Sequence, residues 1–207
     1  MFSKLQYISQ GETAATQLKN INEALDAGCS WVQLRFKNAS ESELKTTADV
    51  VKKLCVAYHA TFIINDHPHI AKAVDADGVH LGLTDMFIKE AIEIVGADKI
   101  IGGTANTLQD VLQRVNEDCS YIGLGPFRFT TTKANLSPIL GLEGYEKIMT
   151  ELKQLNIKIP IYAIGGILPD DISSIMQTGV YGLAGSGIIT NHTNKKELVK
   201  EINAYML

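Results

Sequence analysis

The most constraining feature of this sequence is a series of eight short apolar runs separated by stretches of helical character. The runs are rich in isoleucine, valine and leucine, and they occupy residues 5–8, 31–34, 61–64, 78–81, 100–103, 121–123, 161–164 and 182–184. Runs of this length and composition are typical of strands that are buried on both faces. Because parallel strands are joined through crossovers, their alternation with helices predicts an α/β protein built from βα units.

The stretches between the runs carry helix signals. We expect helices over residues 41–58, 86–96, 107–116, 141–155 and 194–206, and a short helix opened by Pro169. Ser40 followed by Glu43 has the spacing of a capping box, and Thr107 and Asn194 are suitable N-cap residues. These helices supply crossovers for the parallel strands.

The chain length narrows the architecture. Eight units in 207 residues leave about 26 residues for each unit, which is compact beside the ~250 residues of a typical barrel of this kind. No linker, low-complexity segment or charge block divides the chain. We therefore expect a single (β/α)8 TIM barrel over residues 1–207, with a doubly wound open sheet as the alternative.

The net charge of the chain argues against nucleic acid and acidic membranes as partners. The 19 basic and 23 acidic residues give a net charge of −4, so we expect no nucleic acid and no acidic membrane surface as a partner. Uncharged apolar stretches are too short to cross a bilayer, and residues 1–7 lack the apolar core of a signal peptide, so we expect a cytoplasmic protein.

Cys29, Cys55 and Cys119 form no C-x-x-C pair and are expected to be buried, reduced thiols.

Candidate ligand-binding residues follow the strands, because parallel α/β sheets and barrels bind ligands at the carboxyl ends of their strands. After the run 31–34, the alternation of side chains places Gln33, Arg35 and Lys37 on one face. Two cations at a strand end predict an anion site. The alternative is a solvated charge pair that only ends the strand.

Two acids follow neighbouring strands. Asn65 and Asp66 come at the end of the run 61–64, and Asp85 follows the run 78–81. Two carboxylates beside an anion site favour Mg²⁺, which is held by one or two acids together with substrate phosphates. Alternatively, each acid only caps the helix that follows it.

The histidines near these acids are not expected to form a metal site. His67 and His69, with Asp66, have the residue types of a zinc site, but Pro68 interrupts the strand there and exposed loop histidines are common. His80 lies inside the run 78–81 and is expected to be a hydrogen-bonded core histidine.

A second group of candidates has the character of a phosphate site. The loop after the run 121–123 contains Thr130, Thr132 and Lys133, which fits a flap over a phosphate, with a merely flexible connection as the alternative. The last two strands are followed by the pairs Gly165-Gly166 and Gly185-Ser186. Glycines allow backbone N–H groups to approach a phosphate closely.

Together these residues predict two anion sites on one mouth, one cationic and metal-assisted, the other lined by backbone. This pattern fits two phosphorylated small-molecule substrates, or one substrate phosphorylated at both ends. No Ser/His/Asp or Cys/His arrangement is evident, so covalent acyl chemistry is not expected. A homo-oligomer is compatible with the sequence, although no apolar stripe marks an interface.

Six motifs occur in a distinctive order along nearly the whole chain. They are V-Q-L-R-x-K at 32–37, I-N-D at 64–66, A-D-G-V-H-L-G at 76–82 with Asp85, G-L-G-P at 123–126, T-x-T-K at 130–133 and A-I-G-G-I at 163–167. On these motifs the chain resembles the thiamine-phosphate synthase family. The resemblance implies a TIM barrel and a Mg²⁺-dependent condensation. Hydroxymethylpyrimidine pyrophosphate and hydroxyethylthiazole phosphate would give thiamine phosphate and pyrophosphate.

The resemblance also implies roles for individual residues. Asp66 and Asp85 would hold Mg²⁺, and the pyrophosphate would be contacted by Arg35, Lys37, Asn65 and Lys133. The thiazole phosphate would lie near Gly166, Ser186 and the threonines Thr130 and Thr132, and Gln33 matches another active-site position. The expected catalytic residues are Arg35, Lys37, Thr104 and Lys133.

Some positions depart from the family pattern. Thr104 stands where the family usually has serine, so its role in pyrimidine binding rests on the retained hydroxyl. Leu83 and Thr84 replace a usual Gln-Glu pair, and Phe129 replaces a common proline. The segment after the run 182–184 is one residue shorter than in the family pattern. The match of Ser186 to the family's phosphate-binding position therefore depends on how this segment is aligned.

Two alternative functions have distinct sequence requirements. A thiazole tautomerase, a sister branch of the same fold, resembles the synthase but lacks the second metal acid and the T-x-T-K lysine, and it has a histidine where this chain has Asn106. A non-catalytic regulator that binds thiazole phosphate would need no metal acids. The presence of Asp85 and Lys133 favours the synthase.

Overall fold

The chain forms a closed barrel of parallel strands in a computed structural model that describes residues 2–129 and 138–205. The strands follow one another around the barrel in chain order, and β1 pairs with β8 through Leu5↔Leu183 and Tyr7↔Gly185. Their bounds are β1 Leu5–Ile8, β2 Trp31–Leu34, β3 Thr61–Asn65, β4 Gly78–Leu81, β5 Ile100–Ala105, β6 Tyr121–Leu124, β7 Ile161–Ile164 and β8 Gly182–Gly185. The predicted TIM barrel is confirmed, and closure excludes the open sheet.

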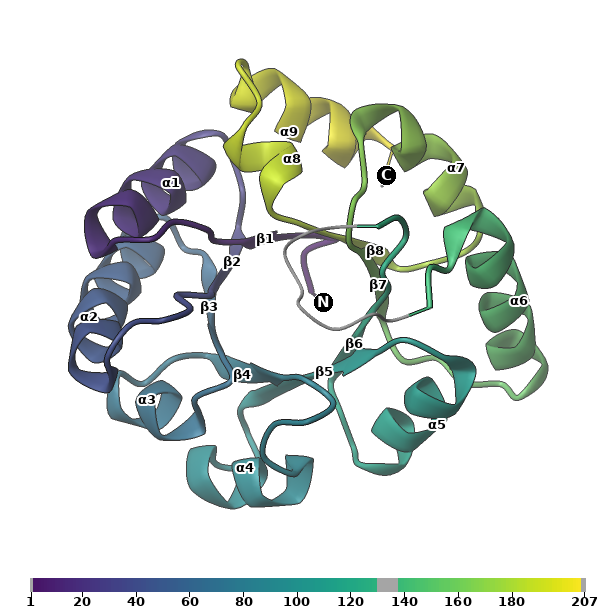
Figure 1. Ribbon diagram of the computed structural model, residues 1–207, viewed down its shortest axis with the longest axis horizontal. Helices are drawn as coiled ribbons and strands as arrows, with labels where there is room; N and C mark the ends of the chain where they lie inside the picture. Colours follow the sequence, from purple (N-terminus) through teal and green to yellow (C-terminus); the bar gives the residue numbers. More distant parts are fainter. Residues whose placement is uncertain (1, 130–137, 206–207) are drawn as a thin grey trace.

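The helices surround this barrel (Figure 1). Their bounds are α1 Ala14–Asp26, α2 Glu41–Ala57, α3 Pro68–Ala73, α4 Ile88–Val95, α5 Leu108–Asn116, α6 Gly141–Gln154, the 3₁₀ turn η1 Pro169–Asp171, α7 Ile172–Gln177, α8 Gly187–Thr190 and α9 Lys195–Ala204. Ser40, Thr107 and Asn194 cap α2, α5 and α9 as predicted, each accepting a backbone N–H from three residues ahead.

Three helices were not among the sequence predictions, namely α1, α3 and α8. Helix α1 buries Gln17, Ile21, Ala24 and Leu25, which lie on one face of the helix. Four strands also extend one or two residues beyond the predicted runs. They are β3, β5, β6 and β8, which continue to Asn65, Ala105, Leu124 and Gly185. These extensions bring polar and glycine residues into the carboxyl ends of the strands.

Alternation along the strands separates two cores. One core lies between the strands and the outer helices. The other fills the barrel interior and contains Ile8, Trp31, Ile63, Tyr121, Tyr162 and Ala184. The Trp31 ring packs edge-on against Tyr121 and Tyr162, with centroids 4.9 and 5.2 Å apart. Since Trp31 and Tyr121 begin their strands, these rings close the amino end of the barrel and leave the carboxyl end to other side chains.

The three cysteines lie in the outer core as free, buried thiols, as predicted. Burial raises the pKa of Cys29, Cys55 and Cys119 to about 12. Within the described ranges, none of the helices has the length and apolar character needed to span a membrane.

Gly102 faces the barrel interior at a crowded point. A Cβ there would lie 2.5 Å from Nδ1 of His80 and against the Tyr121 ring. We predict that Gly102→Ala lowers the free energy of unfolding by about 1–3 kcal/mol, because an extra methyl overpacks the interior. Denaturant unfolding followed by circular dichroism measures the change.

Gly123 provides the matched control, because it faces the same interior from the next strand. Its nearest neighbour to an added Cβ is Cε1 of His80, at 3.3 Å. Gly123→Ala should therefore cost clearly less than Gly102→Ala. Equal losses for the two variants would contradict the packing argument.

Candidate active site

The barrel mouth contains a cavity of about 740 Å³, within the size range of small-molecule sites. Arg35 lines it from one side, and the glycine segments that follow β7 and β8 line it from the other. A neighbouring hollow of about 520 Å³ shares Gln10 and Arg35 with this cavity and also contains Lys37. The predicted cationic and glycine-lined sites therefore meet at one mouth.

Arg35 is fixed at its backbone by two side chains that the sequence analysis did not single out. Its N–H donates to Oγ of Ser9 at 2.9 Å, and its carbonyl accepts from Nε2 of Gln17 at 3.2 Å. The same Gln17 amide also donates to the carbonyl of Gly11 at 2.9 Å. Burial lowers the pKa of Arg35, while the nearby Asp66 carboxylate opposes that shift.

The two predicted acids meet, as expected for neighbouring strands. The carboxyls of Asp66 and Asp85 lie close enough to influence the pKa of Asp66. Burial, followed by contact with Asp85, raises the pKa of Asp66, while Arg35 and Asn65 act in the opposite direction. Two neighbouring carboxylates repel each other unless a proton or a cation lies between them.

The backbone places this acid pair. Asp66 has a left-handed conformation, with φ of 63°, and its N–H donates to the carbonyl of His80 at 2.9 Å. Asp85 reaches back to its own turn, because its Oδ2 accepts from the N–H of Gly82 at 2.6 Å. A cation at this site would compete with the Gly82 contact for the Asp85 carboxylate.

The donor set at these acids suits Mg²⁺ better than zinc. Across residues 2–129 and 138–205, no group of three or more His, Cys, Asp or Glu side chains could hold a metal ion, so the zinc site of His67, His69 and Asp66 is not formed. Mg²⁺ keeps several waters and binds one or two carboxylates together with phosphates. The Asp66–Asp85 pair fits that requirement.

Two predicted ligand-binding residues lie in the barrel interior rather than on the cavity wall. Gln33 is 1% exposed and donates to Oε1 of Gln6 at 3.2 Å. Thr104 is 8% exposed, and its Oγ1 lies 3.0 Å from Nε2 of His80. Neither residue lines the cavities described above. His80 is buried and hydrogen-bonded, as predicted.

The glycines after β7 are required by the loop that packs against them. Gly165 and Gly166 have φ values of 93° and 71°, and a Cβ at either position would meet Pro126 or Arg128. Arg128 donates to the carbonyl of Gly166 at 2.7 Å and binds both carboxylate oxygens of Asp171, at 2.8 and 2.9 Å. This bidentate pair, which the sequence analysis missed, joins the loops after β6 and β7.

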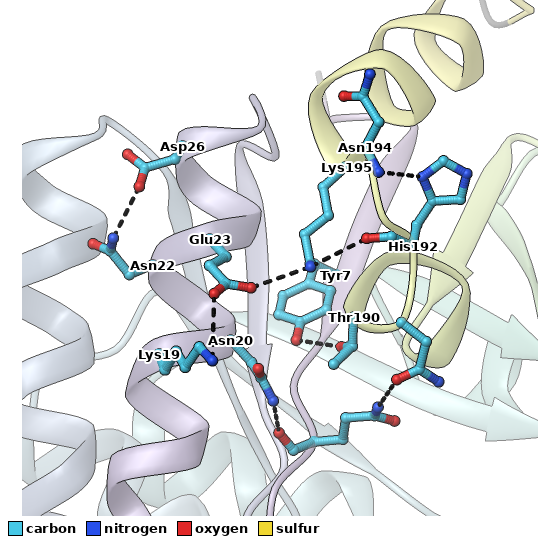
Figure 2. A network of polar contacts seen from close by, with 12 residues as sticks. Tyr7, Lys19, Asn20, Asn22, Glu23, Asp26, Thr190, His192, Asn194 and Lys195 are labelled. Carbon is cyan, nitrogen blue, oxygen red and sulfur yellow. Dashed lines mark hydrogen bonds and ion pairs between the residues drawn. The ribbon is translucent and has the colours of Figure 1, made fainter.

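Ser186 belongs to a polar network that reaches the outer helices. Its Oγ donates to Oε1 of Gln10 at 3.2 Å, while Asn20 on α1 donates to the Gln10 carbonyl at 2.7 Å. Farther out, Glu23 on α1 pairs with Lys195 on α9 at 3.1 Å (Figure 2). These contacts hold the β8 side of the cavity against α1.

Thr130, Thr132 and Lys133 lie outside the described residues. The two ends of their loop are held together at its base. The carbonyl of Pro126 accepts from the N–H of Leu140 at 3.0 Å, and the carbonyl of Phe127 accepts from the N–H of Gly141 at 3.1 Å.

Arg114 on α5 is a further residue that the sequence analysis missed. It is 3% exposed and donates to the carbonyl of Gly82 at 2.8 Å, to the carbonyl of Thr104 at 3.2 Å and to the carboxylate of Glu117 at 2.7 Å. One guanidinium thus joins the carboxyl ends of β4 and β5. It also holds the turn whose N–H binds Asp85.

We predict that Arg114→Met lowers the free energy of unfolding by about 3 kcal/mol, because it strands two carbonyls and one carboxylate. Lys45→Met is the matched control. Its ion pair with Asp49 is about half exposed, so its loss should cost under about 0.5 kcal/mol. Equal effects in denaturant unfolding would show that Arg114 is not a structural clamp.

Comparisons with known proteins agree with this geometry. Residues 5–189 match the family model for thiamine monophosphate synthase. Thiamine-phosphate synthase of Flavobacterium johnsoniae is 55% identical over 203 residues, with 98% of this chain and 96% of the relative covered. Its counterpart from Bacteroides fragilis is 48% identical over 198 residues, with 96% and 97% covered.

Solved structures show the same relationship. Thiamine phosphate pyrophosphorylase from Pyrococcus furiosus superposes with a TM-score of 0.85 at 32% identity, over 98% of this chain and 95% of that chain. A 3-hexulose-6-phosphate synthase, at 15% identity and a TM-score of 0.74 over 99% and 100% of the two chains, shares the fold alone. The chain belongs to the thiamine monophosphate synthase family.

Proposed function

We propose that the protein is a Mg²⁺-dependent thiamine-phosphate synthase that acts in the cytoplasm. It joins hydroxymethylpyrimidine pyrophosphate to hydroxyethylthiazole phosphate and releases pyrophosphate. The observation that carries the proposal is the meeting of the Asp66–Asp85 pair, Arg35 and a glycine-lined cavity at one mouth. Membership of the family supplies the substrates.

The chain's own residues have separate tasks in this reaction. The bond between the pyrimidine methylene carbon and the pyrophosphate oxygen breaks, its electron pair leaves with pyrophosphate, and the thiazole nitrogen lone pair bonds to the carbon. Arg35, Lys37 and Asn65 bind the pyrophosphate, joined by Lys133 from the loop after β6. Because the nitrogen already carries its lone pair, the residues need not remove a proton from it.

The metal would act on the pyrophosphate of one substrate, and the glycines on the phosphate of the other. Asp66 and Asp85 would hold Mg²⁺, which neutralises charge on the leaving group when bound. Gly165, Gly166, Gly185 and Ser186 would bind the thiazole phosphate, together with the hydroxyls of Thr130 and Thr132. The cavity then orients the nucleophile and excludes water.

A direct assay tests the proposal. Incubation of both phosphorylated substrates with Mg²⁺ should yield thiamine phosphate and pyrophosphate in equal amounts, detected by chromatography. Chelation with EDTA should stop the reaction, and excess Mg²⁺ should restore it. Calorimetric titration with magnesium pyrophosphate separates the alternatives, because a regulator confined to thiazole phosphate would give no magnesium-dependent heat. Absence of both product and heat would exclude the synthase.

The metal assignment makes a separate prediction. Asp66→Asn and Asp85→Asn should each lower kcat at least ~100-fold, because a clamp on developing charge is weakened. Asp75→Asn is the control, because Asp75 is an exposed acid that pairs with Lys99 away from this mouth, and its kcat should be unchanged. Normal turnover by both site variants at limiting Mg²⁺ would refute the assignment.

A further inference from the structure

A set of hydrogen-bonded polar side chains lies in the barrel interior below the mouth. Its members come from five different strands and are each at most 8% exposed; they are Gln6, Gln33, His80, Thr104 and Tyr121. Buried polar groups are costly unless their hydrogen bonds are made. The direction of each hydrogen bond in this set is therefore constrained by its neighbours, beginning with the Tyr121 phenol.

The Tyr121 phenol fixes the first direction. Nε2 of Gln6 donates to the phenol oxygen at 3.0 Å. Burial raises the pKa of Tyr121, and hydrogen bonds from Gln6 and Gln33 oppose that rise, as amide donors to the oxygen do. A hydroxyl oxygen accepts two hydrogen bonds and donates one. Oε1 of Gln6 accepts from Gln33 at 3.2 Å, so Gln6 faces the phenol with its N–H, and the phenol proton is left for Nδ1 of His80, 3.1 Å away.

The tautomer of His80 then determines which atom donates in its hydrogen bond with Thr104. If Nδ1 accepts from Tyr121, the neutral imidazole carries its proton on Nε2. Nε2 then donates to Oγ1 of Thr104 across 3.0 Å. The hydroxyl proton of Thr104 consequently cannot go to His80 and is left for another acceptor. In the described part of the chain, no second side chain or carbonyl is placed to take it from Thr104 Oγ1.

The backbone leaves room for this contact. Gly102 and Gly123 face the same interior space, and a Cβ on Gly102 would lie 2.5 Å from Nδ1 of His80. Arg114 holds the Thr104 carbonyl from the outer side of the barrel at 3.2 Å. Thr104 is also the last interior-facing residue of β5, because Ala105 ends the strand and alternation turns it outward. Beyond Thr104 the barrel interior leads toward the carboxyl ends of the strands, below the cavities of the mouth.

We propose that His80 is a positioning residue that presents the Thr104 hydroxyl as a hydrogen-bond donor to the substrate. The group recognised is an acceptor, either a ring nitrogen or a phosphoryl oxygen of the substrate that occupies the mouth. This inference rests on the proposed function for the identity of that substrate. It assigns Tyr121, with Gln6 and Gln33 behind it, the task of selecting the His80 tautomer.

The tautomer is measured without substrate by ¹⁵N NMR of protein with labelled histidine at neutral pH. The chain has five histidines, and the His80 signals are identified by their loss in His80→Asn. We expect a protonated Nε2 and an unprotonated Nδ1. Protonation of Nδ1, alone or together with Nε2, overturns the inference, because Tyr121 would then accept from the ring rather than donate to it.

A double-mutant cycle measures whether His80 acts through the Thr104 hydroxyl. Thr104→Val should lower kcat/KM about tenfold through loss of one hydrogen bond, and Thr104→Ser should regain most of it. His80→Asn, which is too short to reach Thr104, should cost about as much in the wild-type background and less than about twofold beside Thr104→Val. Equal losses in both backgrounds overturn the inference.

Two controls separate a positioning role from other causes. Thermal unfolding of each variant shows whether the barrel is intact. If His80→Asn fails to fold, the His80 signals of the wild-type chain are identified by elimination, with single variants of the four other histidines. A wild-type chain without synthase activity would overturn the proposed function. An active enzyme with the other tautomer would overturn this inference alone.

Discussion

Strict alternation of side chains in a closed barrel is the constraint on which the rest of the structure depends. Each strand contributes every second residue to a small interior, and Trp31, Tyr121 and Tyr162 fill one end of it. The other end receives the later interior-facing residues, including Gln33 and, beyond β2, Arg35. A shift of β2 by one residue would turn Arg35 toward the helices and bring an apolar side chain to the mouth.

The sequence predicted the barrel well because each strand core is a short, unbroken apolar run. It located strand ends less well, since Asn65, Ala105 and Gly185 extend strands beyond the apolar residues. Whether such residues stay in a strand depends on pairing with a neighbour that local composition does not encode.

The candidate site likewise contains residues that local sequence predicts and residues that it does not. The acids, the Arg35 segment and the glycines follow strands directly, so topology alone brings them to one mouth. The residues that hold them were missed because their partners are distant in sequence. Arg128 binds Asp171 across 43 positions and Arg114 binds the Gly82 carbonyl across 32. Neither pairing leaves a local pattern, and each depends on the loop or helix packing that the closed barrel creates.

Electrostatics divides the mouth into two unlike halves. On the β3–β4 side, the two neighbouring carboxylates of Asp66 and Asp85 oppose the approach of a phosphate until a cation lies between them. On the β7–β8 side, the charge of Arg128 is already paired with Asp171. A phosphate there would therefore be bound by the backbone N–H groups of the glycine segments. A site that depends on a cation and one that does not can therefore select different phosphorylated groups. That difference orients two substrates in one cavity without a separate domain for each.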